Sequence, residues 1–93
     1  MSVGVLRIEF SVFGARSLKE KRSVIQPFIH KIRNNYNVSI TELDGDSEID
    51  QVTIGFAHIA TASKDNHRKL SQILTEAESV KDLHINSYRT EVL

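Results

Sequence analysis

The sequence changes from a strand pattern to a helix pattern within Gly14-Ala15-Arg16-Ser17-Leu18-Lys19-Glu20-Lys21-Arg22. Gly14 permits a sharp turn there, because a residue without a Cβ adopts backbone conformations that other residues disfavour. Ser17 and Glu20 have capping-box spacing, in which the serine oxygen accepts from the Glu20 N–H and the Glu20 carboxylate accepts from the Ser17 N–H. The stretch therefore predicts that a helix begins at Leu18.

Four cations crowd the start of this helix, where the helix dipole already carries positive charge and disfavours them. An anion bound at this end would relieve the repulsion. Alternatively, the cations are solvated and screened by salt. The sequence leaves both interpretations open. The candidate anion- or RNA-binding residues are Arg16, Ser17, Lys19, Lys21, Arg22 and Arg33.

The rest of the chain alternates between the two-residue period of strands and the 3.6-residue period of helices. Pro27 lies inside the first helical pattern and should kink or split the helix near residues 23–26. The apolar stripe continues in phase across it, so we expect one bent helix. Ser63 is expected to cap the second helix, with His67 on its inner stripe. A break in alternation predicts a bulge near Ser87–Tyr88. The predicted strands are Val3–Val12, Val38–Leu43, Gln51–Thr61 and Leu83–Val92, and the first helix is Leu18–Asn35.

The order β-α-β-β-α-β predicts a ferredoxin-like α+β fold, a single domain over residues 1–93. Its four-stranded antiparallel sheet carries two helices on one face, and its other face is open. This topology places Glu42 and the acidic turn beside the basic helix start. We therefore expect a structural ion pair between Glu42 and Lys21, and a contact of the 44–50 turn with Arg16 or Lys19.

Charge is balanced overall but strongly polarised along the sequence. Residues 1–35 hold seven cations against two carboxylates, a net +5, whereas residues 36–62 hold five carboxylates and no lysine or arginine. Zero net charge argues against a general polyanion binder. The absence of cysteine excludes disulfides and thiol catalysis and suits a cytoplasmic protein. No signal-peptide pattern or membrane-spanning apolar run is present, so we expect no membrane association.

Catalytic and cofactor motifs are not found, and we expect no catalytic residues, no metal and no cofactor. The four histidines lack metal-ligand spacing, and His58 is interpreted as a hydrogen-bonded residue at the core edge. The carboxylates of residues 44–50 resemble a cation loop but do not match the EF-hand, so a solvated turn is the favoured interpretation. An RNA-recognition motif is disfavoured, because Phe56 should face the core rather than the open face.

A family resemblance rests on residues 3–7, on the quoted stretch 14–22 and on Asn37-Val38-Ser39-Ile40-Thr41-Glu42-Leu43-Asp44. Together these segments resemble the bacterial YlxP-like family, small proteins of unknown function. The resemblance implies a ferredoxin-like fold and a cytoplasmic protein. Genes of this family commonly neighbour those of translation and ribosome-maturation factors, which implies an RNA- or ribosome-associated role. It carries over no catalytic residues.

Two functional hypotheses follow. In the first, the chain is a non-enzymatic RNA- or ribosome-associated module that uses the basic helix start to contact phosphate. In the second, it is a self-associating scaffold or homodimer, because Val3, Val5 and Ile59 form an apolar patch on the open sheet face. A small-molecule cofactor is expected in neither case.

Overall fold

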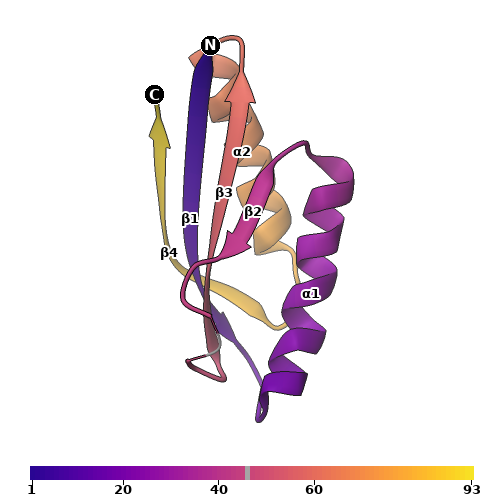
Figure 1. Ribbon diagram of the computed structural model, residues 1–93. Helices are drawn as coiled ribbons and strands as arrows, with labels where there is room; N and C mark the ends of the chain where they lie inside the picture. Colours follow the sequence, from indigo (N-terminus) through magenta and orange to yellow (C-terminus); the bar gives the residue numbers. More distant parts are fainter. Residues whose placement is uncertain (46) are drawn as a thin grey trace.

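The computed structural model describes residues 1–45 and 47–93 and has the predicted β-α-β-β-α-β order (Figure 1). The predicted ferredoxin-like fold class is confirmed, and α1 is continuous across Pro27 as expected. Both helix starts follow extended residues, Ser17 and Ala62. The elements are β1 Ser2–Val12, α1 Leu18–Asn35, β2 Ser39–Glu42, β3 Gln51–Ala60, α2 Ser63–Glu78 and β4 Leu83–Val92.

The sheet has the order β2-β3-β1-β4, and every neighbouring pair is antiparallel. β1 is central: Leu6 lies opposite Phe56 on one side and Thr90 on the other. The two ends of the chain lie close together (Figure 1), since Val3 and Leu93 exchange backbone hydrogen bonds of 3.1 and 2.8 Å. These hydrogen bonds hold the end of the chain, after β4, against the start of β1.

The core lies between the sheet and the two helices. Successive residues of β1 alternate between this core and the open face of the sheet. The even-numbered residues of β1 from Gly4 to Val12 are buried, and its odd-numbered ones from Val3 to Ser11 are half-buried or exposed. From α1, the Phe28 ring packs edge-on against Phe10 and Phe56, with centroids 5.8 and 6.4 Å apart. Phe56 is thus a core residue, as predicted.

The start of α2 differs from the prediction. Ser63 is the first helical residue, and the N-cap is Ala62, whose side chain makes no capping hydrogen bond. The buried stripe runs through Asn66, Leu70, Ile73 and Ala77, whereas His67 is exposed. The helical pattern placed His67 on the inner stripe and did not single out Asn66. A fully buried asparagine requires hydrogen-bond partners from distant segments, which the helical period alone does not reveal.

Those partners form a buried polar network at the end of the sheet where the two ends of the chain meet. The Asn66 amide donates to Ser2 Oγ at 2.9 Å, and Ser2 Oγ donates to the Leu93 carbonyl at 3.0 Å. Because the amide nitrogen faces Ser2, the Asn66 oxygen accepts from His58 Nδ1 at 2.7 Å. The network links α2 to β1, β3 and the last residue, and it gives His58 the expected hydrogen bond at the core edge.

The predicted bulge in β4 is confirmed one residue earlier. Glu9 lies opposite Ser87 while Phe10 lies opposite Ile85, so Asn86 is the extra residue. Its side chain exchanges hydrogen bonds with Ser11 on the open face, which compensates for the break in the ladder. A bulge bends the strand that contains it and increases its twist.

The end of α1 contacts α2 through Tyr36. A side-chain hydrogen bond to Glu76 raises the pKa of Tyr36 to about 12, and burial and the negative charge of Glu76 act in the same direction. Lys69 lies 5.5 Å from the centre of the Tyr36 ring, and Lys31 pairs with Glu76 at 3.7 Å. Polar and charged contacts therefore join the end of α1 to α2.

The titration of Tyr36 tests this contact, since the chain has only one other tyrosine, Tyr88. In a Tyr88→Phe background, phenolate absorbance should show Tyr36 still protonated at pH about 10, the ordinary tyrosine pKa, and Glu76→Gln should lower its pKa towards that value. The raised pKa contributes stability that is complete below the unfolded value and is lost as pH rises from about 10 to about 12. An identical titration with and without Glu76 would contradict the assignment.

Two strand glycines provide a stability test with a built-in control. A Cβ on Gly4 would lie 2.9 Å from Cγ of the fully buried Asn66, whereas one on Gly55 would meet the tip of the exposed Leu43 at 3.1 Å. Gly4→Ala should lower the free energy of unfolding by about 1–3 kcal/mol, because Asn66 cannot move without losing its hydrogen bonds. Gly55→Ala should be neutral or slightly stabilising. Urea denaturation measures both, and equal losses would refute the packing argument.

Candidate nucleic-acid interface

The helix start is capped largely as predicted. Ser17 is extended, and its Oγ accepts from the Glu20 N–H at 3.1 Å. The Glu20 carboxylate accepts from the Arg16 N–H at 2.8 Å rather than from the Ser17 N–H. Gly14 has φ +76°, the left-handed conformation that its role in the turn requires. The Ser17 hydroxyl therefore has a structural function at this position.

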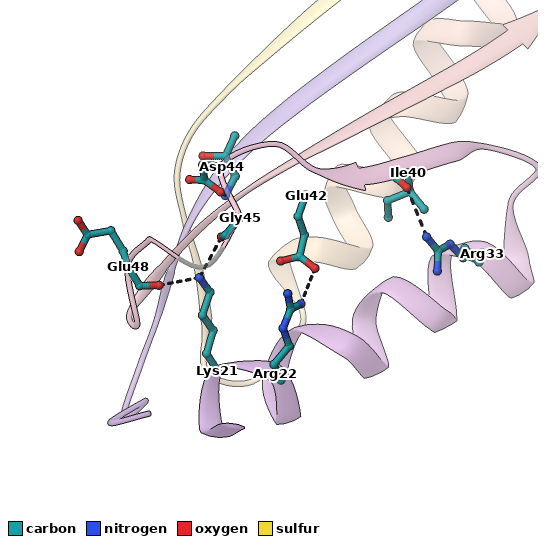
Figure 2. Close-up of polar contacts among 9 residues, drawn as sticks. Lys21, Arg22, Arg33, Ile40, Glu42, Asp44, Gly45 and Glu48 are labelled. Atoms are coloured by element: carbon teal, nitrogen blue, oxygen red, sulfur yellow. Dashed lines mark hydrogen bonds and ion pairs between the residues drawn. The ribbon is translucent and has the colours of Figure 1, made fainter. Parts of the chain in front are cut away.

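Lys21 is fully buried and anchors the loop that follows β2. Its ammonium donates to the Glu48 carbonyl at 2.6 Å and to the Gly45 carbonyl at 3.5 Å (Figure 2). Lys21 is in phase with the buried residues of α1, so its stem packs with them while its charged end reaches backbone oxygens. A group used in this way is not exposed to an external anion.

The predicted Glu42–Lys21 pair is wrong, because Glu42 pairs with Arg22 instead. Arg22 Nη1 lies 2.5 Å from Glu42 Oε2, and both side chains are less than one-third exposed (Figure 2). The other carboxylate oxygen, Oε1, is buried and has no hydrogen-bond partner among the described residues. One helical step separates positions 21 and 22 by about 100°. Lys21 therefore faces the loop while Arg22 faces the outer strand.

Arg33 lies in the last turn of α1, at the end opposite Lys21 and Arg22 and beside the first residues of β2. Its Nη2 donates to the Ile40 carbonyl at 3.4 Å, and the side chain remains exposed (Figure 2). Between Arg22 and Arg33, α1 and β2 border a groove of about 270 Å³. The groove is lined by Arg22, Gln26, Ile29, His30, Arg33, Ile40, Thr41, Glu42 and Gly45.

The polar residues that α1 contributes to this groove form a row along one side of the helix, and Lys19 extends the row beyond the groove. Spacings of three and four residues keep Lys19, Arg22, Gln26, His30 and Arg33 on one helix face. With a rise of about 1.5 Å per residue, the row from Lys19 to Arg33 is about 21 Å long. We call these five residues the α1 row. Gln26 and His30 were absent from the predicted site, although the same spacing placed them there.

Arg16 and Lys19 are exposed, and no ion pair of either is found within residues 1–45 and 47–93. The expected contact of the acidic turn with these two cations is therefore not found in the described part of the turn. Asp46, which belongs to that turn and to the considered cation loop, lies outside the described residues. Asp44 instead accepts from the Thr53 N–H at 3.0 Å.

The predicted convergence of cations is only partly found. Lys21 and Arg22 are directed toward the loop and toward Glu42, whereas Arg16, Lys19 and Arg33 expose their charge. Among the described residues, no group of three or more histidines and carboxylates is arranged to hold a metal ion. In the same part of the chain, neither helix is long and apolar enough to cross a membrane.

The fold and this surface define a small ferredoxin-like α+β protein with a cationic row on its first helix. The chain belongs to the family described as a protein of unknown function, DUF503, whose model matches residues 3–90. It is 27% identical over 89 residues to the uncharacterized protein YlxP of Bacillus subtilis strain 168, covering 96% of this chain and 97% of that protein. The resemblance read from the sequence is thereby confirmed.

Solved structures with the same fold are distant in sequence. The de novo designed protein Foldit4 has a TM-score of 0.59 at 15% identity, covering 98% of this chain and 97% of that one. SnoaB, a cofactor-independent oxygenase from Streptomyces nogalater, has a TM-score of 0.55 at 17% identity, covering 99% and 90%. At such identities the likeness concerns the fold alone.

Two lysines in the first turn of α1 distinguish a cation with a structural role from an exposed one. Lys21→Met should lower the free energy of unfolding by about 1–3 kcal/mol, because two loop carbonyls lose a charged donor. Lys19→Met, two residues away and exposed, should change it by less than about 0.5 kcal/mol. Chemical denaturation measures both. A Lys21→Met variant as stable as Lys19→Met would show that the loop does not depend on the ammonium.

Proposed function

We propose that this protein is a non-enzymatic, cytoplasmic RNA- or ribosome-associated module that contacts phosphate through the exposed cations of α1. The α1 row supports this, because its cations lie in line on one side of a helix, and two of them, Arg22 and Arg33, line a groove. Arg16 extends the row beyond the helix start. Phosphates repeat along a nucleic-acid backbone. A linear set of cations therefore fits such a backbone better than it fits a compact anion.

The composition of the row suits a weak, backbone-directed contact. Lys19 and Arg33 supply charge at its two ends, while Gln26 and His30 supply hydrogen-bonding groups between them. Arg22 contributes less net charge to the groove, because the Glu42 carboxylate lies against it. Stacking of bases on the sheet is not part of this proposal, since Phe56 is buried in the core.

The charge count sets the expected strength. With Arg16, Lys19 and Arg33 as the phosphate contacts, binding to single-stranded RNA should weaken with salt with a log–log slope of about −2, at roughly −0.7 per phosphate. That slope is shallow compared with those of dedicated polyanion binders. It agrees with a chain of zero net charge, which lacks the long-range attraction of a basic domain.

Variants on the two walls of the groove should change RNA affinity in opposite directions. Arg33→Gln should weaken binding of a fluorescent single-stranded RNA by about two- to fivefold, the size of one exposed ion pair. Glu42→Gln should strengthen it, because a negative charge leaves the groove wall. Fluorescence anisotropy between about 50 and about 200 mM salt measures both affinity and slope.

The matched control is Arg68→Gln, which removes an exposed arginine from α2. It should leave RNA affinity unchanged, whereas a general effect of lost positive charge would weaken binding by this variant as well. A combined Arg16→Gln, Lys19→Gln and Arg33→Gln variant should lose the salt-dependent binding to the oligonucleotide and to ribosomal RNA. Binding by this variant equal to that of the natural chain would overturn the proposed function.

A further inference from the structure

The open face of the sheet is a second surface, on the side opposite the helices, and the proposed RNA contact does not use it. It carries the outward residues of β1 and β3, of which Val3, Val5, Ala57 and Ile59 are apolar. Ile59 is 67% exposed and Val5 is 38% exposed. Val5 lies directly opposite Ala57, and Val3 opposite Ile59, so the four side chains form one continuous patch.

Beside this patch, the face has a shape that a matching surface can fill. A shallow depression of about 230 Å³ lies over β1, β2 and β3, lined by Val5, Arg7, Thr41, Gly55 and Ala57 among others. Leu43 lies over Gly55 at the border of this depression, with 51% of its surface exposed. An exposed leucine next to an apolar hollow is a knob and a hole on one surface.

The charges of the same face are balanced but unfavourably placed within one chain. Arg7 and Arg89 lie directly opposite each other on β1 and β4, an arrangement that destabilises a sheet when it is not compensated. Arg7 pairs with Glu9 at 3.5 Å, whereas within the described chain no ion pair of Arg89 is found. Glu91 lies on the same strand, two residues from Arg89, and faces the same side.

We propose that this open face binds the same face of a second copy of the chain. The face carries two carboxylates and two arginines. In a symmetric pair, Glu9 and Glu91 of one copy can therefore lie opposite the arginines of the other copy. The chain has zero net charge, so two copies do not repel each other at long range. The knob and hole are likewise self-complementary, as an isologous interface requires.

The face is large enough for such an interface. The strands β1, β3 and β4 have 11, 10 and 10 residues, so each is about 34–37 Å long at about 3.4 Å per residue, and the shorter β2 widens the face at one edge. A standard interface buries about 800 Å² on each partner, which this face can supply. RNA fits the face poorly, because Glu9 and Glu91 would repel phosphate and the core holds Phe56, which would otherwise stack with bases.

The test is the mass of the purified chain by light scattering from micromolar to millimolar concentration. The natural chain should form a dimer, and Ala57→Glu or Ile59→Glu should raise its dissociation constant at least about tenfold. Gln72→Glu, an equal charge change on the exposed side of α2, should leave it unchanged. A strict monomer, a dimer unaffected by the sheet variants, or equal loss with the control would each overturn the proposal.

Cross-linking gives a second readout that does not depend on the tolerance of a buried charge. The chain has no cysteine, so a single Val5→Cys substitution introduces the only thiol. This variant should form a disulfide-linked dimer on mild oxidation, whereas Gln72→Cys should not. Equal cross-linking of the two variants would refute the face-to-face arrangement. Neither readout uses the α1 row, so failure here leaves the RNA proposal to its own test.

Discussion

The buried ammonium of Lys21 is the contact on which the helix-bearing side of the molecule depends. It joins the first turn of α1 to the backbone of the loop after β2, and so fixes how β2 lies along the helix. This placement brings Glu42 to Arg22 and Ile40 to Arg33 (Figure 2). The groove exists because the helix and the short edge strand are held side by side at this end.

Both helices use the same arrangement. The buried stripe of α1 includes Lys21, Ile25, Phe28 and Ile32, and that of α2 consists of Asn66, Leu70, Ile73 and Ala77. In each, positions i, i+4, i+7 and i+11 face the core, and the first is polar. Its polar group reaches backbone or side chains at one end of the sheet. Lys21 reaches the carbonyls of Gly45 and Glu48, and Asn66 reaches Ser2 and His58. Apolar residues fix the packing, and the polar one fixes the position along the axis.

Local patterns predicted most of the fold. The alternation of β1 and the Ser17–Glu20 spacing depend on neighbours in sequence, so the strand bounds agree with the structure to within one residue and the start of α1 agrees with it. The partners of Lys21 and Asn66 depend on distant segments, and backbone carbonyls have no sequence signature. The Glu42–Lys21 prediction failed for this reason: topology placed Glu42 near the helix start, but the choice between two adjacent cations depended on the loop path.

The two sides of the sheet impose different requirements on one small chain. On the helix side, Lys21 and Arg22 contact groups of the chain itself, so the proposed RNA contact has only a few exposed cations. The open side carries apolar residues together with equal numbers of arginines and glutamates. In a face-to-face pair, the helices of both copies point outward on opposite sides. A short RNA would then contact one α1 row, and only a longer one could reach both and gain avidity from the pairing. The proposed self-association and the proposed RNA binding are therefore compatible in this fold, because they draw on different residues and opposite faces.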